Sequence, residues 1–180
     1  MTITCGLLAV SLTLGACGGG SSSGSSSVTP AAYVKAICQS VGPFEKDVQS
    51  RSSALNLGAI KNPAQGKTAL QGFLSAVASD TDNAVSKLKA AGSPDVKNGK
   101  QISSAIVTAF SQLRGALSQA VSSANSLPTG SAAAFKPAAV TLGNPVRTSM
   151  SNIGSGLTGL SSPALESAAK KEPACQSLNG

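Results

Sequence analysis

Hydrophobic residues recur at helical spacing through most of the chain after residue 28. Apolar side chains three, four or seven positions apart lie on one face of a helix, and four long segments follow this pattern. They extend from Thr29 to about Leu55, from Asn62 to Gly92, from Ser93 to about residue 126, and from about Ala132 to Leu160. The stripes that define them are Val34, Ile37, Val41, Phe44, Val48 and Leu55; Leu70, Phe73, Leu74, Val77, Ala84, Val85 and Leu88; Ile102, Ile106, Phe110, Leu113, Leu117 and Val121; and Phe135, Val140, Val146, Met150, Ile153, Leu157 and Leu160.

Proline and glycine mark the ends of these segments. Thr29-Pro30, Asn62-Pro63 and Ser93-Pro94 are typical helix starts, and Leu127-Pro128-Thr129-Gly130 ends the third segment. Ser162-Pro163 begins a final short helix. Gly42-Pro43 is expected to bend the first helix without ending it, because the same stripe continues on both sides. The pattern predicts an all-α fold, an up-down-up-down four-helix bundle with a short C-terminal helix.

Composition agrees with closely packed helices. Aromatic residues make up 3% of the chain and tryptophan is absent, so we expect an aliphatic and thin core. Ala, Ser and Gly predominate, and such segments suit helices better than strands, which favour β-branched and aromatic residues. We therefore assign the apolar stripes to the core.

The first 16 residues carry no charge and are mostly apolar. The run is long enough for a signal-peptide core and too short to span a bilayer, which needs about 20 apolar residues. Its last residues, Leu14-Gly15-Ala16-Cys17, resemble the lipobox of bacterial lipoproteins, which implies that Cys17 receives a diacylglycerol and becomes the mature N-terminus. We expect a signal peptide at residues 1–16, the lipidated Cys17 with a flexible Gly/Ser tether at residues 17–28, and the helical domain at residues 29–180.

Two of the four cysteines, Cys38 and Cys175, belong to the expected helical domain. An even number of cysteines in an oxidising compartment favours one disulfide. In an up-down bundle the chain leaves at the end where it entered, so Cys38 near the start of the first helix can meet Cys175 after the fourth. Two buried free thiols are the alternative.

One residue type that many catalytic sites need is missing, although Ser-Lys and paired-carboxylate chemistry stay formally possible. The chain has no histidine, which excludes Ser-His-Asp and Cys-His arrangements and the HExxH zinc site. Asp47 and Arg51 are spaced as a solvated pair on a helix surface. Two strings that partly match nucleotide-binding motifs, at residues 154–159 and 66–68, do not follow a strand. We expect no enzyme activity, no metal site and no cofactor.

The net charge of +7 suggests anionic partners. Export, the single tyrosine and the absence of a basic run with aromatic partners argue against nucleic acid. In an up-down bundle one group of lysines lies at the end nearest the tether, where it would contact anionic lipid or wall polymer: Lys87, Lys89, Lys97 and Lys100. Another group is expected at the far end: Lys61, Lys67 and Lys136. The alternative is a solvated surface that keeps the domain soluble.

The lipobox-like start, the tether, the string Ala-Ala-Tyr-Val-Lys-Ala-Ile-Cys at residues 31–38 and the terminal cysteine together resemble small secreted lipoproteins of actinobacteria. The resemblance implies an extracytoplasmic helical domain anchored to the cell membrane, and it implies no site residues. We expect a non-catalytic binding or interaction domain that docks to an envelope protein or an anionic polymer. A carrier that holds a small apolar ligand between its helices is the alternative. An apolar pocket of roughly 300 Å³ or more within the bundle would reverse this order.

Overall fold

Helices make up nearly all of the part of the chain that the structure describes. The computed structural model describes residues 27–55, 62–156 and 162–176. In chain order the elements are β1 (Ser27–Val28), α1 (Pro30–Ala54), α2 (Pro63–Ala90), β2 (Ser93–Pro94), α3 (Gly99–Ala124), α4 (Ala132–Gly156), α5 (Pro163–Lys171) and α6 (Pro173–Gln176). The all-α prediction is confirmed, since the two strands have only two residues each.

Side-chain caps begin helices α1 and α2 where the sequence predicts. Thr29 Oγ1 accepts a hydrogen bond from the backbone N–H of Ala32 at 3.3 Å, and Asn62 Oδ1 accepts one from Ala64 at 2.9 Å. A proline follows each cap, at a position where the missing N–H costs no bond within the helix. Helix α1 continues through Pro43, as its uninterrupted stripe predicts.

The predicted start of the third helix is wrong. Ser93 and Pro94 form β2, which pairs in parallel with β1, and α3 begins only at Gly99. Asn98 precedes this helix in the left-handed conformation (φ 62°), and its side chain makes no capping hydrogen bond. A Cβ atom on Gly99 would overlap the carbonyl oxygen of Pro94, so the start of α3 requires glycine. The start of the domain therefore lies against the connection between α2 and α3.

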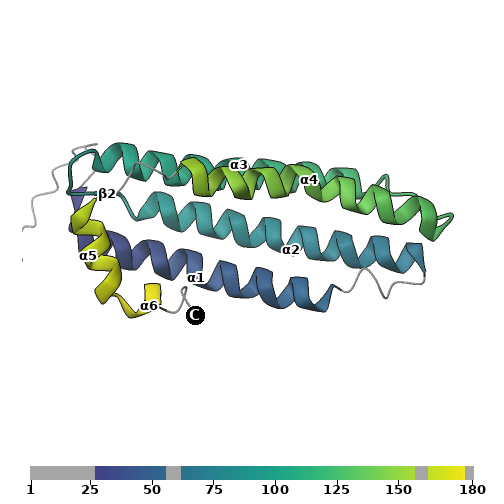
Figure 1. Ribbon diagram of the computed structural model, residues 1–180, viewed down its shortest axis with the longest axis horizontal. Helices are drawn as coiled ribbons and strands as arrows, with labels where there is room; N and C mark the ends of the chain where they lie inside the picture. Colours follow the sequence, from purple (N-terminus) through teal and green to yellow (C-terminus); the bar gives the residue numbers. More distant parts are fainter. Residues whose placement is uncertain (1–26, 56–61, 157–161, 177–180) are drawn as a thin grey trace, which may run out of the picture.

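Helices α2 and α3 form the centre of the domain (Figure 1). Helix α1 packs against α2, α4 packs against α3, and the chain reverses direction from each long helix to the next. Helices α1 and α4, in contrast, make little direct contact. Helices α1 and α4 are therefore held together mainly through α2 and α3, which lie between them in the order of packing.

Two clusters of buried side chains form the core. The larger cluster joins α2, α3 and α4, and the smaller one joins α2 and α3 nearer the β strands. Phe44 of α1 packs against both clusters. Its ring and the Phe110 ring form a T-shaped pair with centroids 5.9 Å apart. The core is aliphatic and rich in alanine, as the composition predicts; its best-buried members include Leu88, Leu117, Ala120, Ala124 and Phe135.

The apolar stripe predicted for α4 is only partly buried, which corrects its assignment to the core. Phe135, Ala139 and Leu142 are buried, but Val140 is 59% exposed and Met150 is 50% exposed. Each residue of an α-helix turns the side chain by about 100°, so a helix that buries Ala139 turns Val140 away from the same contact. Val146 is partly buried against the larger cluster. The last three residues of this stripe lie outside the described side chains: Ile153, Leu157 and Leu160.

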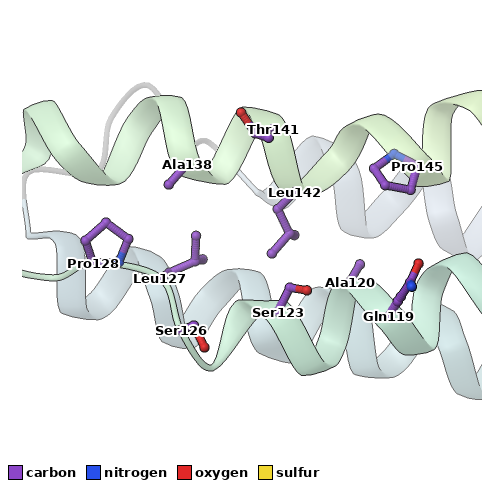
Figure 2. A pocket seen from close by; sticks show the side chains of 10 residues that line it. All are labelled: Gln119, Ala120, Ser123, Ser126, Leu127, Pro128, Ala138, Thr141, Leu142 and Pro145. Atoms are coloured by element: carbon purple, nitrogen blue, oxygen red, sulfur yellow. The ribbon is translucent and has the colours of Figure 1, made fainter.

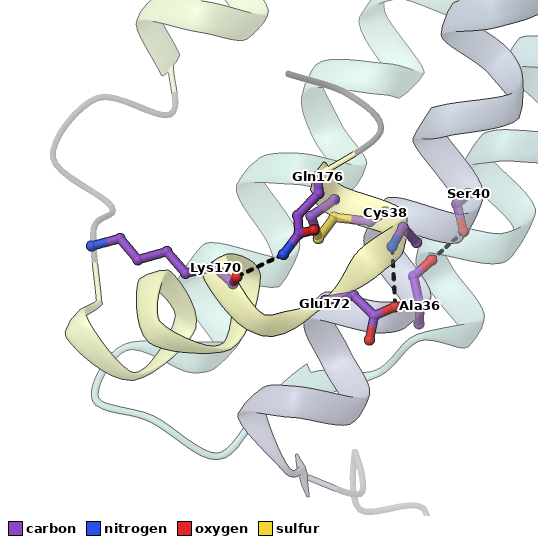
Figure 3. Close-up of a disulfide and its surroundings, with 8 residues drawn as sticks. Ala36, Cys38, Ser40, Lys170, Glu172 and Gln176 are labelled. Carbon is purple, nitrogen blue, oxygen red and sulfur yellow. Dashed lines mark hydrogen bonds between the residues drawn. A yellow bond between two sulfur atoms is a disulfide. The ribbon is translucent and has the colours of Figure 1, made fainter. Parts of the chain in front are cut away.

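The C-terminal helices α5 and α6 fold back on the first half of α1 (Figure 1). Cys175 of α6 is joined to Cys38 of α1 by a disulfide, with their Cα atoms 5.1 Å apart (Figure 3). Beside it, Glu172 Oε1 accepts a hydrogen bond from the backbone N–H of Ala174 at 3.3 Å. The predicted disulfide and the predicted short C-terminal helix are confirmed, and the alternative of two free thiols is wrong.

Candidate functional site

An apolar cleft lies between α1 and α4, above α2 and α3. Its inner section has a volume of about 300 Å³ and takes its lining from all four helices. The lining is aliphatic and aromatic over most of its surface, and it includes Phe44, Val48, Phe73, Val77, Leu113 and Val146. Arg147 of α4 is the one charged residue among the described residues of this lining.

An outer section of about 510 Å³ adjoins the inner one along α1 and α3. Phe44, Val48, Leu113 and Met150 line both sections, so the two are neighbours, and we call them together the α1–α4 cleft. Polar residues of α1 border the outer section: Glu45, Gln49 and Ser52. The cleft is therefore apolar inside and polar at its edge, as ligand pockets commonly are.

The two exposed hydrophobic residues of α4 belong to this cleft. Val140 and Met150 are the large apolar side chains that remain at least half exposed in the described ranges, and both line the inner section. Scattered apolar residues on a surface are ordinary, but exposed apolar residues that gather in one groove indicate a binding site. Sequence reasoning missed this site, because it placed Val140 and Met150 in one core stripe with Phe135, and only the burial of positions 135, 139 and 142 separates them.

Small residues explain why α4 leaves the cleft open. Ala120 and Ala124 of α3 lie in the same buried cluster as Ala139 of α4. Helices with small residues at their contact positions approach each other closely. Helix α4 therefore packs along α3 and makes few contacts with α1. Figure 2 shows the other side of this contact, where Ala138 and Leu142 of α4 point toward α3.

That side also carries a surface groove, of about 480 Å³ (Figure 2). Its lining includes Gln119, Ser123, Ser126 and Thr141, and only two leucines provide large apolar side chains. A third cavity of about 300 Å³ lies beneath α5, between Ile37 of α1 and Ile106 of α3. Of these spaces, the α1–α4 cleft is the one that all four long helices line.

Asp47 of α1 and Asp80 of α2 form a separate acidic pair with Arg51. Arg51 Nε lies 2.5 Å from Asp47 Oδ2, which confirms the predicted surface pair, and 3.9 Å from Asp80 Oδ2. Burial raises the pKa of Asp80, and so do its hydrogen bond with Asp47 and the charge of that carboxylate. The hydrogen bond from Arg51 lowers the pKa of Asp47. Sequence reasoning missed Asp80 because only the packing of α1 on α2 brings it to this pair.

The structure places the four lysines proposed for anionic contacts in one region of the domain. Lys87 and Lys89 are in the last turn of α2, and Lys97 and Lys100 flank the start of α3, so all four lie near β2, and all are exposed. Lys87 also lines a cavity with Asp47 and Asp80. Of the far group, Lys136 is exposed in α4, and Lys61 lies outside the described residues. Lys67 Nζ donates a hydrogen bond to the carbonyl oxygen of Asn125 at 2.6 Å.

Several other expectations have no counterpart in the described ranges. Cys17, expected to carry lipid, lies outside them. Within them, no helix is long and apolar enough to cross a membrane. No group of three or more His, Cys, Asp or Glu side chains in these ranges is arranged to hold a metal ion.

Comparison with protein families, with characterised proteins and with solved structures finds no significant match to this chain. A function must therefore be argued from the chemistry of the α1–α4 cleft and of the surface around it.

Proposed function

We propose that this protein is a lipoprotein of the cell envelope whose helical domain binds an elongated apolar ligand in the α1–α4 cleft. The sequence supports the setting: a signal peptide at residues 1–16, a lipid on Cys17, a Gly/Ser tether, and an extracytoplasmic up-down-up-down four-helix bundle. The domain carries its ligand without catalysis and without a cofactor.

The observation that carries this proposal is the apolar lining of the inner section, contributed by four helices around about 300 Å³. This volume lies at the lower end of the range of small-molecule pockets, about 300–1,000 Å³. An apolar pocket of roughly 300 Å³ is the size at which a carrier becomes the preferred function over an interaction domain, and the inner section reaches that size. Binding of an apolar ligand is therefore favoured over docking to a protein partner.

The dimensions of the cleft favour an acyl chain. At 1.5 Å per residue, the α1 segment from Phe44 to Leu55 extends about 16 Å, and both residues line the inner section. The hydrocarbon core of a bilayer is about 30 Å thick and contains two leaflets, so one acyl chain extends about 15 Å. A domain tethered to a membrane has such chains close at hand.

A variant that fills the cleft tests the proposal. Gly143 lines the inner section, and a Cβ atom built on it meets nothing within 4 Å, so Gly143→Leu would place a side chain in the cavity. The uncharged fluorescent probe N-phenyl-1-naphthylamine should bind the full chain, and Gly143→Leu should weaken this binding at least about tenfold.

The matched control is Gly115→Leu in α3. A Cβ atom at Gly115 also meets nothing within 4 Å, but this residue is exposed and lines none of the cavities described above. Both variants replace a glycine inside a helix and gain about the same helix propensity, roughly 1 kcal/mol. Probe binding that Gly143→Leu leaves unchanged, or that both variants reduce equally, would contradict a site in the cleft.

The proposed anchor has a test of its own. In a bacterial host, the mature protein should begin at Cys17 and sediment with membranes, and Cys17→Ala should remain uncleaved or reach the wrong compartment. N-terminal sequencing and fractionation measure both properties. A wild-type protein that is soluble and begins at another residue would refute the anchor.

A second function is favoured by the exposed lysines near β2. We propose that they bring the tethered end of the domain to anionic lipid or wall polymer. Each lysine near such a surface contributes about 1 kcal/mol, and the attraction decays within a Debye length of roughly 8 Å. The domain from Val28 onward, which lacks both the lipid and the apolar residues 1–16, should bind anionic vesicles weakly and in a salt-sensitive manner.

A charge-matched pair of variants separates position from net charge. Lys97→Gln/Lys100→Gln should lose vesicle binding, whereas Lys46→Gln/Lys136→Gln, which removes two exposed lysines elsewhere, should retain it. Lys67 is unsuitable as a control because it bonds to Asn125. Equal losses in the two variants would mean that only net charge matters.

A further inference from the structure

Arg147 differs from the other two arginines of the chain. Arg51 and Arg114 pair with carboxylates, Asp47 and Asp82. Arg147 has no carboxylate within 4 Å among the described residues, and it lines the inner section of the cleft. Because Arg147 is exposed beside an apolar cavity, its guanidinium can pair with an acidic group that a ligand supplies.

Its position on α4 places this charge at the cavity. Gly143 lies one turn before Arg147 and Met150 lies three residues after it, and both line the same section. Residues three and four apart are neighbours on a helix surface. Because Gly143 has no side chain and a Cβ atom there would meet nothing within 4 Å, nothing from that position occupies the space beside Arg147.

The inference rests on the proposed binding of an apolar ligand and specifies its class. We propose that the ligand is a single-chain amphiphile with an anionic head group, and that Arg147 binds this head while the chain lies in the inner section toward Leu55. A planar guanidinium matches a carboxylate or a phosphate with two parallel hydrogen bonds. The side-chain amide of Gln49, at the edge of the outer section, can donate a further hydrogen bond to such a head.

The opposite edge of the cleft carries the competing charge. Glu45 of α1 lines the outer section and makes no ion pair with Arg147. A negative charge there repels an anionic head and would attract a cationic one, so Glu45 provides a built-in control. Removing its charge should strengthen binding of an anionic amphiphile or leave it unchanged.

Competition against the neutral probe N-phenyl-1-naphthylamine tests the head group. Palmitate, hexadecanol and hexadecylamine share one chain and differ in charge, so the full chain should bind palmitate at least about tenfold more tightly than the other two. Arg147→Gln should remove this preference by weakening palmitate alone, and Arg147→Lys should restore part of it. Glu45→Gln should not weaken palmitate.

Two comparisons keep the outcomes distinct. Hexadecyl phosphate measured beside palmitate shows whether the natural head is a phosphate or a carboxylate, since the guanidinium accepts both. Equal affinity of the wild type for acid and alcohol, a preference for the amine, or an equal loss of all ligands in Arg147→Gln would each overturn the role of Arg147. The proposed apolar site has separate refutations: failure of the neutral probe to bind, or probe binding that Gly143→Leu leaves unchanged.

Discussion

Removing the disulfide should destabilise the domain strongly while leaving its helices in place. Cys38 and Cys175 are 137 residues apart in sequence, so the bond closes almost the whole domain into one loop. The chain-entropy model gives about 5 kcal/mol for a loop of this length, an upper limit because disulfides often contribute less. In the folded protein the loss is local, because α5 has no buried residue and packs mainly on α1.

At roughly 2–4 °C per kcal/mol for a domain of this size, the double variant Cys38→Ala/Cys175→Ala should melt below the wild type by up to about 10–20 °C. Far-UV circular dichroism at low temperature should lose no more than the signal of α5 and α6. Tryptic peptides from protein taken from the envelope, analysed by mass spectrometry without reductant, should contain the joined pair. Two freely alkylatable thiols, or an unchanged melting temperature in the double variant, would refute the reasoning.

Two further predictions concern stability. The folded state holds the proton of Asp80 more tightly than the unfolded state, so the contribution of this group is complete below the ordinary pKa of 3.8 and is lost as the pH rises through the raised value. Asp80→Asn should therefore raise the free energy of unfolding at pH 7 by less than about 1 kcal/mol, because solvent screens the pair. The gain should vanish below about pH 4 in thermal melts across pH, and a gain that persists in acid would contradict this origin. Gly99→Ala should lower the free energy of unfolding, measured by urea denaturation, by about 1–3 kcal/mol, because its Cβ would overlap the carbonyl oxygen of Pro94. The control Gly115→Ala should instead stabilise α3 by about 0.5–1 kcal/mol. Equal effects of the two alanines would rule out the steric explanation.

Local chemistry made much of the fold predictable. The starts of α1 and α2 follow from Thr29 and Asn62, whose side chains cap the N–H groups that a helix start leaves free. The disulfide followed from a count of cysteines and an antiparallel order of helices. The same local reasoning failed at Ser93, because pairing of β2 with β1, more than sixty residues earlier in the chain, overrides the helix-start signal of Ser93-Pro94.

The residues of the candidate site could not be predicted, because they depend on which helix α4 packs against. The periodic apolar residues of α4 predict an amphipathic helix that includes Val140 and Met150. Its packing on α3 through small residues such as Ala120 and Ala139, which leaves Val140 and Met150 exposed along a cleft, is seen only in the folded domain. Periodicity specifies which residues share a face of one helix, whereas the packing of a face depends on the shapes of side chains from distant segments.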